Sequence, residues 1–197
     1  MKALLCYAAL GFFLGSTFLV AQSPPADAVT IAYQRSSAPA LAAGQKQLLT
    51  LCREISFRGI PYKFGGTSGR GMDCSASIQH VLGKVGITLP RTADQQANRM
   101  AQRGQLWRAG ARESEAAIFS RLRPGALLFW ARKDSPNKVS HVMMFIGMNG
   151  KNKARLWGAQ QTGRTGMNGS GVDYYPYTLE KKSRSSKLVA YGHPVAN

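Results

Sequence analysis

A cysteine and a histidine carry the most reactive side chains of this sequence. Cys74 stands between Asp73 and Ser75 at the start of a segment with helical periodicity, and His141 begins a strand-like run much later in the chain. A helix N-terminus and an imidazolium partner both stabilise a thiolate. A single cysteine and a distant histidine placed in this way indicate a thiol hydrolase, with Cys74 as nucleophile and His141 as base.

The helix expected over residues 74–85 sets the direction of the thiol. Cys74 lies four residues before Ile78, on the apolar stripe, so its side chain should point into the protein. His80 falls on the nearly opposite side and is interpreted as a surface residue. Asp73 suits the N-cap position.

A catalytic imidazole is usually oriented by a third group. The Asn-Gly pair at 149–150 is a hairpin turn signal. A two-residue turn would pair His141 with Gly158, which has no side chain, whereas a turn looser by two residues would pair it with Gln160. Gln160 is therefore the first choice. The alternatives are a backbone carbonyl, a water molecule, Asn168 and Asp173.

The start of the chain has the pattern of a secretory signal peptide. Residues 1–28 contain one early basic residue, a long apolar run and small residues that suit cleavage after Ala21 or Ala28. A membrane anchor is the alternative, since the apolar run is borderline for a span. Residues 29–39 are expected to be a flexible segment, and residues 40–197 a single catalytic domain.

Export would leave two cysteines, Cys52 and Cys74, because Cys6 lies inside the apolar run. A disulfide is the usual interpretation of two cysteines in an oxidising compartment. Cys52, however, falls on a helical stripe with Leu48 and Ile55, where a small buried group fits well. The pattern therefore favours a free, buried Cys52.

The chain is strongly basic, with 26 Lys and Arg against 9 Asp and Glu and a formal net charge of +17. An exported protein of this charge should bind anionic surfaces, such as cell wall, lipopolysaccharide, phospholipid or nucleic acid. Charge alone does not choose among them. No metal-ligand spacing is present, and we expect no cofactor.

Helical periodicity comes first in the chain and strand-like patterns follow. Helices are expected over residues 40–57, 74–85 and 92–103, with a further helical stretch over 113–122. Strands are expected over residues 126–130, 141–147, 154–160, 172–177 and 188–193. This order predicts an α+β domain whose N-terminal helices pack on an antiparallel sheet.

Several short motifs, in this order, resemble the NlpC/P60 family of cell-wall peptidases, which have a papain-like fold. They are Tyr-Lys-Phe-Gly-Gly at 62–66, Asp-Cys-Ser at 73–75, Leu-Pro-Arg-Thr at 89–92, Pro-Gly-Ala-Leu-Leu-Phe at 124–129 and Ser-His-Val at 140–142. Ala76 and Ala126 stand where the family usually has Gly and Asp. Each motif alone is weak, and the ordered set is specific.

The resemblance implies hydrolysis of stem-peptide amide bonds in peptidoglycan, often between γ-D-glutamyl and a diamino acid. It implies that Cys74 and His141 are catalytic and that Tyr62, Asp73 and Ser75 line the substrate site. Gly158 falls where the family usually has a third His, Asn or Gln, so either Gln160 substitutes or the imidazole is held differently.

The expected location is secreted or periplasmic, at the cell wall. The expected partners are peptidoglycan stem peptides and the anionic envelope surface, which the basic residues would contact; nucleic acid and a stable membrane span after signal cleavage are not expected. Two other functions stay open: a thiol amidase or acyltransferase acting on another amide, and a non-catalytic wall-binding module.

Overall fold

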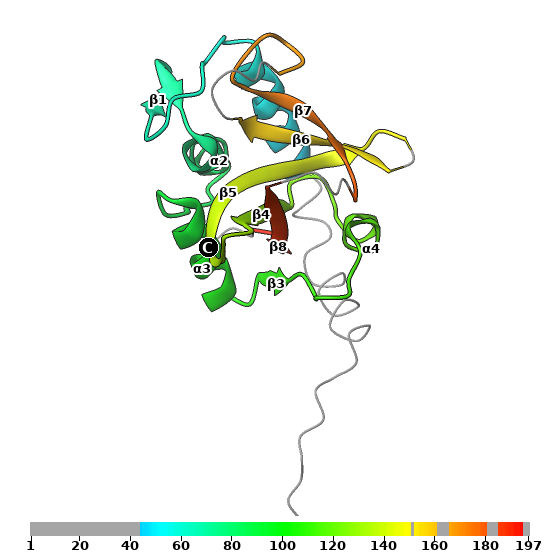
Figure 1. Ribbon diagram of the computed structural model, residues 1–197. Coiled ribbons are helices and arrows are strands. Elements are labelled where there is room, and N and C mark those ends of the chain that lie inside the picture. Colours follow the sequence, from blue (N-terminus) through cyan, green and yellow to red (C-terminus); the bar gives the residue numbers. More distant parts are fainter. Residues whose placement is uncertain (1–43, 151, 161–165, 181–184, 195–197) are drawn as a thin grey trace, which may run out of the picture. The chain divides into compact units, whose positions relative to one another are not determined.

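The structure, a computed structural model, describes residues 44–150, 152–160, 166–180 and 185–194 (Figure 1). These residues form a six-stranded antiparallel sheet, in the order β3-β8-β4-β5-β6-β7, and a small two-stranded sheet, β1-β2. The predicted α+β fold is confirmed. The helices are one over residues 44–56, α2 (Cys74–Gly83), α3 (Ala93–Gln102) and α4 (Glu115–Ser120). The strands are β1 (Thr67–Ser68), β2 (Gly71–Met72), β3 (Leu106–Arg108), β4 (Leu127–Arg132), β5 (Ser135–Met148), β6 (Lys153–Ala159), β7 (Val172–Thr178) and β8 (Ser186–Gly192).

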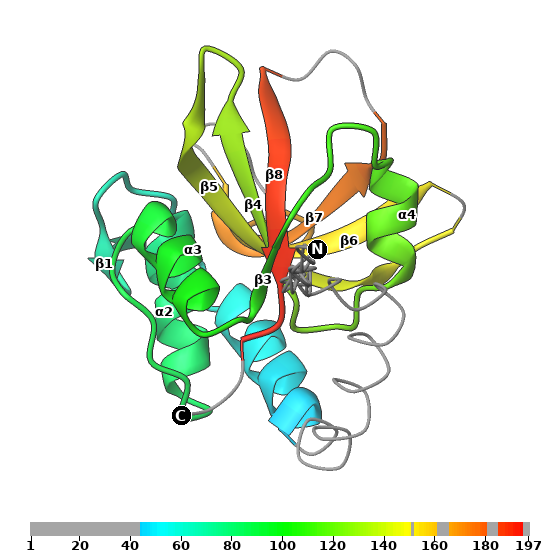
Figure 2. The same ribbon diagram turned by 90° about the horizontal axis from the view of Figure 1, so that it is seen from below.

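Apolar side chains cover both faces of the large sheet. The helix over 44–56, α2 and α3 lie on one face, where Ile78 packs in the same cluster as Val142 and Met144 of β5. The other face carries α4, and there Phe119 stacks edge-on against Phe145 of β5. Figure 2 shows α2 and α3 on one side and α4 near β6 and β7. Because successive side chains of β5 point to opposite faces, they contribute alternately to the two hydrophobic cores.

Trp157 of β6 fixes the first described helix to the sheet. Its side chain is fully buried, and its indole N–H donates to the carbonyl oxygen of Cys52 and to the hydroxyl of Ser56, both at 3.0 Å. Cys52 is itself completely buried, and its thiol lies 3.9 Å from the sulfur of Met144. Cys52 and Cys74 are both free. The prediction of a free, buried Cys52 is confirmed, and a disulfide between the two is wrong.

The hairpin between β5 and β6 has the looser of the two registers considered. Met144 pairs with Trp157 and Phe145 with Leu156, while the loop closes with a hydrogen bond of 2.7 Å from the N–H of Asn149 to the oxygen of Lys153. A two-residue turn is therefore wrong. Continuing the register by three positions would bring residue 160 opposite residue 141, one residue beyond the end of β6.

Several elements differ from the expected ranges. Strands β1, β2 and β3 are only two or three residues long, too short to show a period of two in the sequence. Strand β5 begins at Ser135, in a run of polar residues without apolar alternation. His80 is half-buried, where the helical phase predicted a surface residue.

The expected signal peptide and the segment 29–39 lie outside the described residues. Within the described part of the chain, none of the helices has the length and apolar character that crossing a bilayer requires.

Candidate active site

Cys74 is the first residue of α2, and Asp73 is its N-cap, as predicted. The Asp73 carboxylate accepts a hydrogen bond of 2.9 Å from the backbone N–H of Ala76, which stabilises the first turn of the helix. Cys74 is 8% exposed and belongs to the same apolar cluster as Ile78. The predicted inward direction of the thiol is confirmed.

The thiol lies beside β5, where that strand loses its β6 partner. The backbone N–H of Val142 lies near enough to the Cys74 sulfur to lower the pKa of the thiol. On its other side Val142 pairs with Phe129 of β4, while the pairing of β5 with β6 ends at Met144 and Trp157. The thiol therefore lies near Val142, the residue that follows His141.

His141 is held at a local irregularity of β5. Trp130 of β4 pairs with His141 and Ala131 with Val139, so Ser140 is an extra residue, a β-bulge. The imidazole lies against the Trp130 ring, with 5.8 Å between ring centroids, and its Nε2 atom is buried. Bulges re-aim neighbouring side chains, and this one directly precedes the candidate base.

A carboxylate from α3 fixes the same bulge. The backbone N–H of Val139 donates to Oδ1 of Asp94 at 3.0 Å, and the Ser140 hydroxyl lies 3.4 Å from the Trp130 carbonyl oxygen. Asp94 thereby joins the first turn of α3 to the residues that lead into His141.

Burial dominates the electrostatics of the thiol. It raises the pKa of Cys74, while the N–H groups of Val142, Ser75 and Cys74 itself oppose that rise and the Asp73 carboxylate adds to it. Burial, followed by the charges of Cys74 and Asp73, also raises the pKa of Tyr62. The resting thiol is therefore protonated near neutral pH and needs a base to become nucleophilic.

Arg91 organises the loop and helix around Cys74. Its guanidinium donates to both carboxylate oxygens of Asp73, at 2.9 and 2.7 Å, and also to the Ser75 hydroxyl at 3.0 Å and the Gly66 carbonyl at 3.2 Å. Burial alone would raise the pKa of Asp73, but hydrogen bonds from Arg91 and Ala76 hold it below its ordinary value. Arg91 and Asp73 thus form an ion pair.

The predicted substrate residues gather around this ion pair. Ser75 is buried, and its hydroxyl donates to Oδ1 of Asp73 at 3.1 Å. Tyr62 is half-buried and forms an isolated bridge with Met72, directly before Asp73. Asp73 and Ser75 thus hold the start of α2 together, and Tyr62 is the member of this set with the freest access to solvent.

The candidates for the group that would orient the His141 imidazole lie in different surroundings. The side-chain amide of Gln160 lies 2.9 Å from the sulfur of Met143, which is two residues after His141 in β5 and so on the same face of that strand. Gly158 has a φ of +146°, and a Cβ atom there would lie 3.5 Å from the Ser77 hydroxyl oxygen and 3.7 Å from the Met143 methyl group. Asn168 and Asp173 bind each other, with 2.8 Å between Nδ2 and Oδ1.

Sequence reasoning assigned no role to Gln96, a fully buried side chain of α3. Its amide donates to the carbonyl oxygens of Ser75 and Pro90, both at 2.9 Å, and so ties the start of α2 to the segment that carries Arg91. A polar residue on the buried face of an amphipathic helix was the only signal for it. Among the described residues, no group of three His, Cys, Asp or Glu side chains could hold a metal ion.

Comparison with known proteins gives this arrangement a family. The family model described as "NlpC/P60 family" matches residues 59–172. Similar curated proteins include a gamma-D-glutamyl-L-lysine dipeptidyl-peptidase of Bacillus cereus, 34% identical over 91 residues, which are 46% of this chain and 23% of that protein. A probable endopeptidase NlpC homolog of Haemophilus influenzae is 33% identical over 107 residues, 54% of this chain and 46% of that protein. The matched segment is thus less than half of either relative.

A solved structure supports the fold. A crystal structure of an NlpC/P60 family protein from Bacillus cereus superposes with a TM-score of 0.50 at 23% identity, covering 74% of this chain and 39% of that one. The family match includes the loop before Cys74, both candidate catalytic residues and the Leu-Pro-Arg-Thr segment. Because it spans more than half of the sequence, the chain belongs to the NlpC/P60 family.

Proposed function

We propose that this protein is a peptidoglycan endopeptidase that hydrolyses stem-peptide amide bonds, with Cys74 as nucleophile and His141 as base. The observation that carries the proposal is the position of Cys74 at the start of α2, where the N–H of Val142, the residue after His141, is among the groups that lower the pKa of the thiol. Family membership supports the chemistry. The substrate class is supported by relatives such as a bifunctional muramidase/DL-endopeptidase of Bacillus subtilis, 32% identical over 98 residues, 49% of this chain and 25% of that protein.

In the proposed reaction, His141 accepts the thiol proton while the Cys74 sulfur attacks the carbonyl carbon of the scissile amide. The tetrahedral oxyanion is bound by backbone N–H groups at the start of α2, including that of Cys74, because the first N–H groups of a helix have no acceptor within it. The C–N bond then breaks, and His141 gives its proton to the leaving amine. A water molecule, deprotonated by His141, hydrolyses the thioester and restores the thiol.

Gln160 is the proposed orienting group for His141. The β5–β6 register, extended past the end of β6, brings Gln160 opposite His141, and the Gln160 amide already reaches the neighbouring Met143. Tyr62, Asp73 and Ser75 are proposed to form the wall of the substrate site. In this role Asp73 and Ser75 act mainly by fixing the backbone at the start of α2.

We also propose that the protein is exported, with residues 1–28 as its signal peptide, and acts at the cell wall or in the periplasm. The large excess of Lys and Arg supports attraction to the anionic envelope surface. No cofactor takes part in the proposed reaction.

Purified sacculi test the proposal. The wild-type protein should release peptide fragments whose masses correspond to cleavage within the stem peptide. Cys74→Ala should release none, while Cys52→Ala, which removes the other buried thiol, should keep the activity of the wild type if it stays folded.

Two outcomes of this experiment would contradict the proposal and indicate a different function. Binding to sacculi without any release, equal in the wild type and in Cys74→Ala, would identify a wall-binding module, an alternative that Gly158 favours because it supplies no third side chain. Transfer of an acyl group to an added amine in preference to water would identify an acyltransferase.

A further inference from the structure

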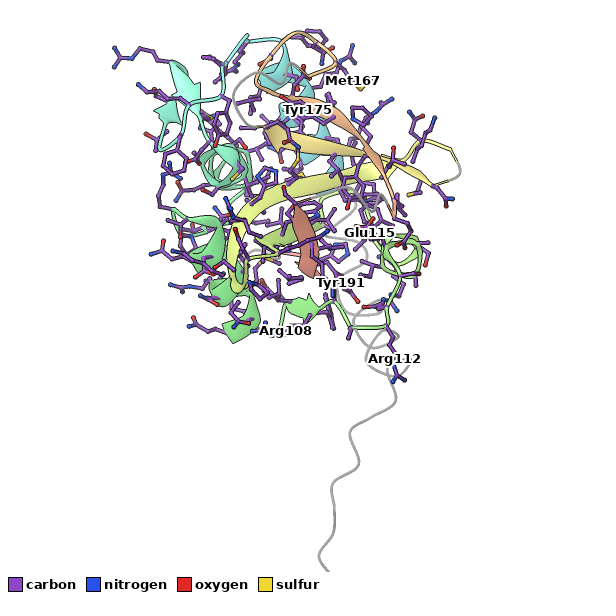
Figure 3. All side chains as sticks on the ribbon, viewed as in Figure 1. Arg108, Arg112, Glu115, Met167, Tyr175 and Tyr191 are labelled. Carbon is purple, nitrogen blue, oxygen red and sulfur yellow. The ribbon has the colours of Figure 1, made fainter. Side chains whose placement is uncertain are left out.

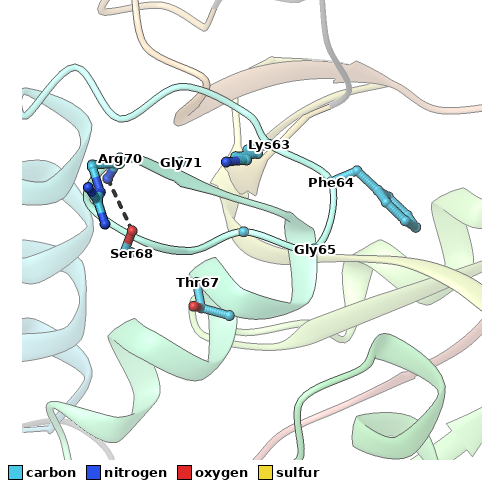
Figure 4. Close-up of a pocket in the computed structure, with 8 residues that line it drawn as sticks. Lys63, Phe64, Gly65, Thr67, Ser68, Arg70 and Gly71 are labelled. Atoms are coloured by element: carbon cyan, nitrogen blue, oxygen red, sulfur yellow. Dashed lines mark hydrogen bonds between the residues drawn. The ribbon is translucent and has the colours of Figure 1, made fainter.

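The segment 63–71, which begins inside the Tyr-Lys-Phe-Gly-Gly motif and ends just before α2, surrounds a partly open pocket that the proposed catalytic groups do not use. The pocket has a volume of about 530 Å³ and is lined by residues of this segment alone (Figure 4). Residues of the paired strands β1 and β2 line part of it.

The pocket has a fixed shape because its glycines allow close approaches. A Cβ atom on Gly66 would lie 2.4 Å from the carbonyl oxygen of Gly71, and one on Gly71 would lie 2.5 Å from the Cβ of Lys63. Backbone hydrogen bonds join Lys63 to Met72 at 3.0 Å and Gly66 to Lys63 at 2.9 Å. The backbone segments that form the pocket are thus held at distances that a side chain at position 66 or 71 would prevent.

The pocket is also rigidly connected to the start of α2. The N–H of Gly65 donates to Oδ2 of Asp73 at 3.1 Å, and the carbonyl oxygen of Gly66 accepts from Arg91. These two glycines belong both to the pocket wall and to the ion pair that holds the residue before Cys74. A group bound in the pocket would therefore lie at a fixed offset from the thiol.

The lining is cationic. Lys63 and Arg70 contribute exposed basic side chains, Thr67 and Ser68 contribute hydroxyl groups, and no acidic residue lines the pocket in this fully described segment. In Figure 4 the side-chain nitrogen of Lys63 points to the side on which Arg70 lies, while Phe64 points away at the other end. The nearest carboxylate in sequence, Asp73, is engaged by Arg91.

We propose that the 63–71 pocket is a substrate subsite that binds a free carboxylate of the peptide, away from the scissile amide. Two cations and two hydroxyl donors around one cavity match the acceptor oxygens of a carboxylate, and such charge-assisted hydrogen bonds are strong and geometrically selective. The inference rests on the proposed function for the identity of the substrate. It adds that the protein selects stem peptides by their free carboxylates.

The test uses soluble stem peptides in which each free carboxylate is converted in turn to a carboxamide. For the wild type, amidation at one position should lower kcat/KM about tenfold, the effect of losing one charge-assisted contact. The double variant Lys63→Gln/Arg70→Gln should cleave the acid and that amide at equal rates. Equal rates for the wild type at every position, or an unchanged preference in the double variant, would overturn the inference.

A matched control removes the same charge elsewhere. Arg112 and Lys153 are exposed, and Figure 3 places Arg112 beyond α4, on the opposite side of the domain from β1. Arg112→Gln/Lys153→Gln should keep the full preference for the acid. Loss of the preference in this control as well would assign it to overall charge and contradict a local subsite.

Binding separates this inference from the proposed function. If the wild type cleaves no stem peptide, the proposed function fails, and the subsite is tested by titrating the acid and amide peptides into Cys74→Ala protein. A dissociation constant about tenfold lower for the acid, abolished by Lys63→Gln/Arg70→Gln, supports the subsite. Equal constants for the acid and amide peptides overturn it.

Discussion

Arg91 and Asp73 form a two-point ion pair, with 2.9 Å between Nη1 and Oδ1 and 2.7 Å between Nη2 and Oδ2. The Asp73 side chain is 11% exposed and that of Arg91 32%. Because Asp73 also caps α2, the ion pair connects the segment before α3 to the helix that starts with Cys74. The position of the thiol thus depends on a contact between two residues that lie 18 positions apart in the sequence, much farther than the turns of one helix.

Asp73→Asn tests the energetic role of this carboxylate. Asparagine also caps helices, so the variant should lose mainly the charge and, at pH 7, about 1–2 kcal/mol of unfolding free energy. The pKa of Asp73 lies below its ordinary value of 3.8. The wild type should therefore keep this advantage above pH 3.8 and lose it as the pH falls through the lower folded pKa. Urea unfolding of both proteins at pH 7 and at successively lower pH measures the difference in unfolding free energy and its dependence on pH. A difference that does not change with pH would contradict a role for the Asp73 charge.

Asp94→Ala should impair catalysis through the position of His141. The N–H of Val139 would lose its acceptor, the bulge at Ser140 would loosen, and kcat should fall about ten- to a hundredfold. Asp94→Asn keeps an oxygen acceptor and should restore most of the rate. Asn98→Ala, which removes a hydrogen bond to the other Asp94 oxygen, serves as the control and should have little effect. A fall in thermal stability without a change in kcat would assign Asp94 a structural role only.

Gly158→Ala should destabilise the protein by about 1 kcal/mol or more through backbone strain. Gly158 has a φ of +146°, yet an added Cβ would meet its nearest atom, the Ser77 hydroxyl oxygen, at an ordinary distance of 3.5 Å. The expected cost is therefore conformational and not steric. Gly83→Ala, at the end of α2 with nothing within 4 Å, should be neutral or stabilising. Chemical denaturation of both variants measures their unfolding free energies. A Gly158→Ala protein as stable as the wild type would contradict the predicted backbone strain.

His193 should make the protein sensitive to moderate acid. Burial, and secondarily Arg123, lowers the pKa of His193 to about 4. Between pH 6.5 and 4 the unfolded chain binds a proton there that the folded protein does not. Unfolding free energy should therefore fall as pH drops through this range, by on the order of 2–3 kcal/mol.

His193→Gln should flatten the dependence of stability on pH, and the half-buried His80→Gln should change it much less. Thermal melts at half-unit pH steps measure the slopes. Equal slopes for the wild type and His193→Gln would contradict the role of His193.

Local information predicted the helix that carries Cys74. The N-cap preference of Asp73 and the apolar stripe through Ile78 depend only on neighbours within two helical turns, and both agree with the structure. The strands that alternate or are continuously apolar were also predictable, because period and burial are visible in short windows.

Contacts between distant segments could not be predicted in the same way. The choice of Asp73 as the partner of Arg91 depends on how the loop before α2 folds back onto the segment before α3. The β5–β6 register depends on the loop after Met148, in which Gly150 and Asn152 both have positive φ, and a turn signal does not specify loop width. The β-bulge at Ser140, which aims His141, has no signature in residue types at all.

The central claim is that Cys74 and His141 act as one catalytic unit, and a double-mutant cycle tests it most directly. The kcat/KM for a soluble stem peptide is measured for the wild type, Cys74→Ala, His141→Ala and the double variant. The account predicts that each single substitution lowers kcat/KM by about a thousandfold or more and that the double variant loses little further, as for residues that work together. Substantial activity in His141→Ala, or losses that multiply in the double variant, would contradict it.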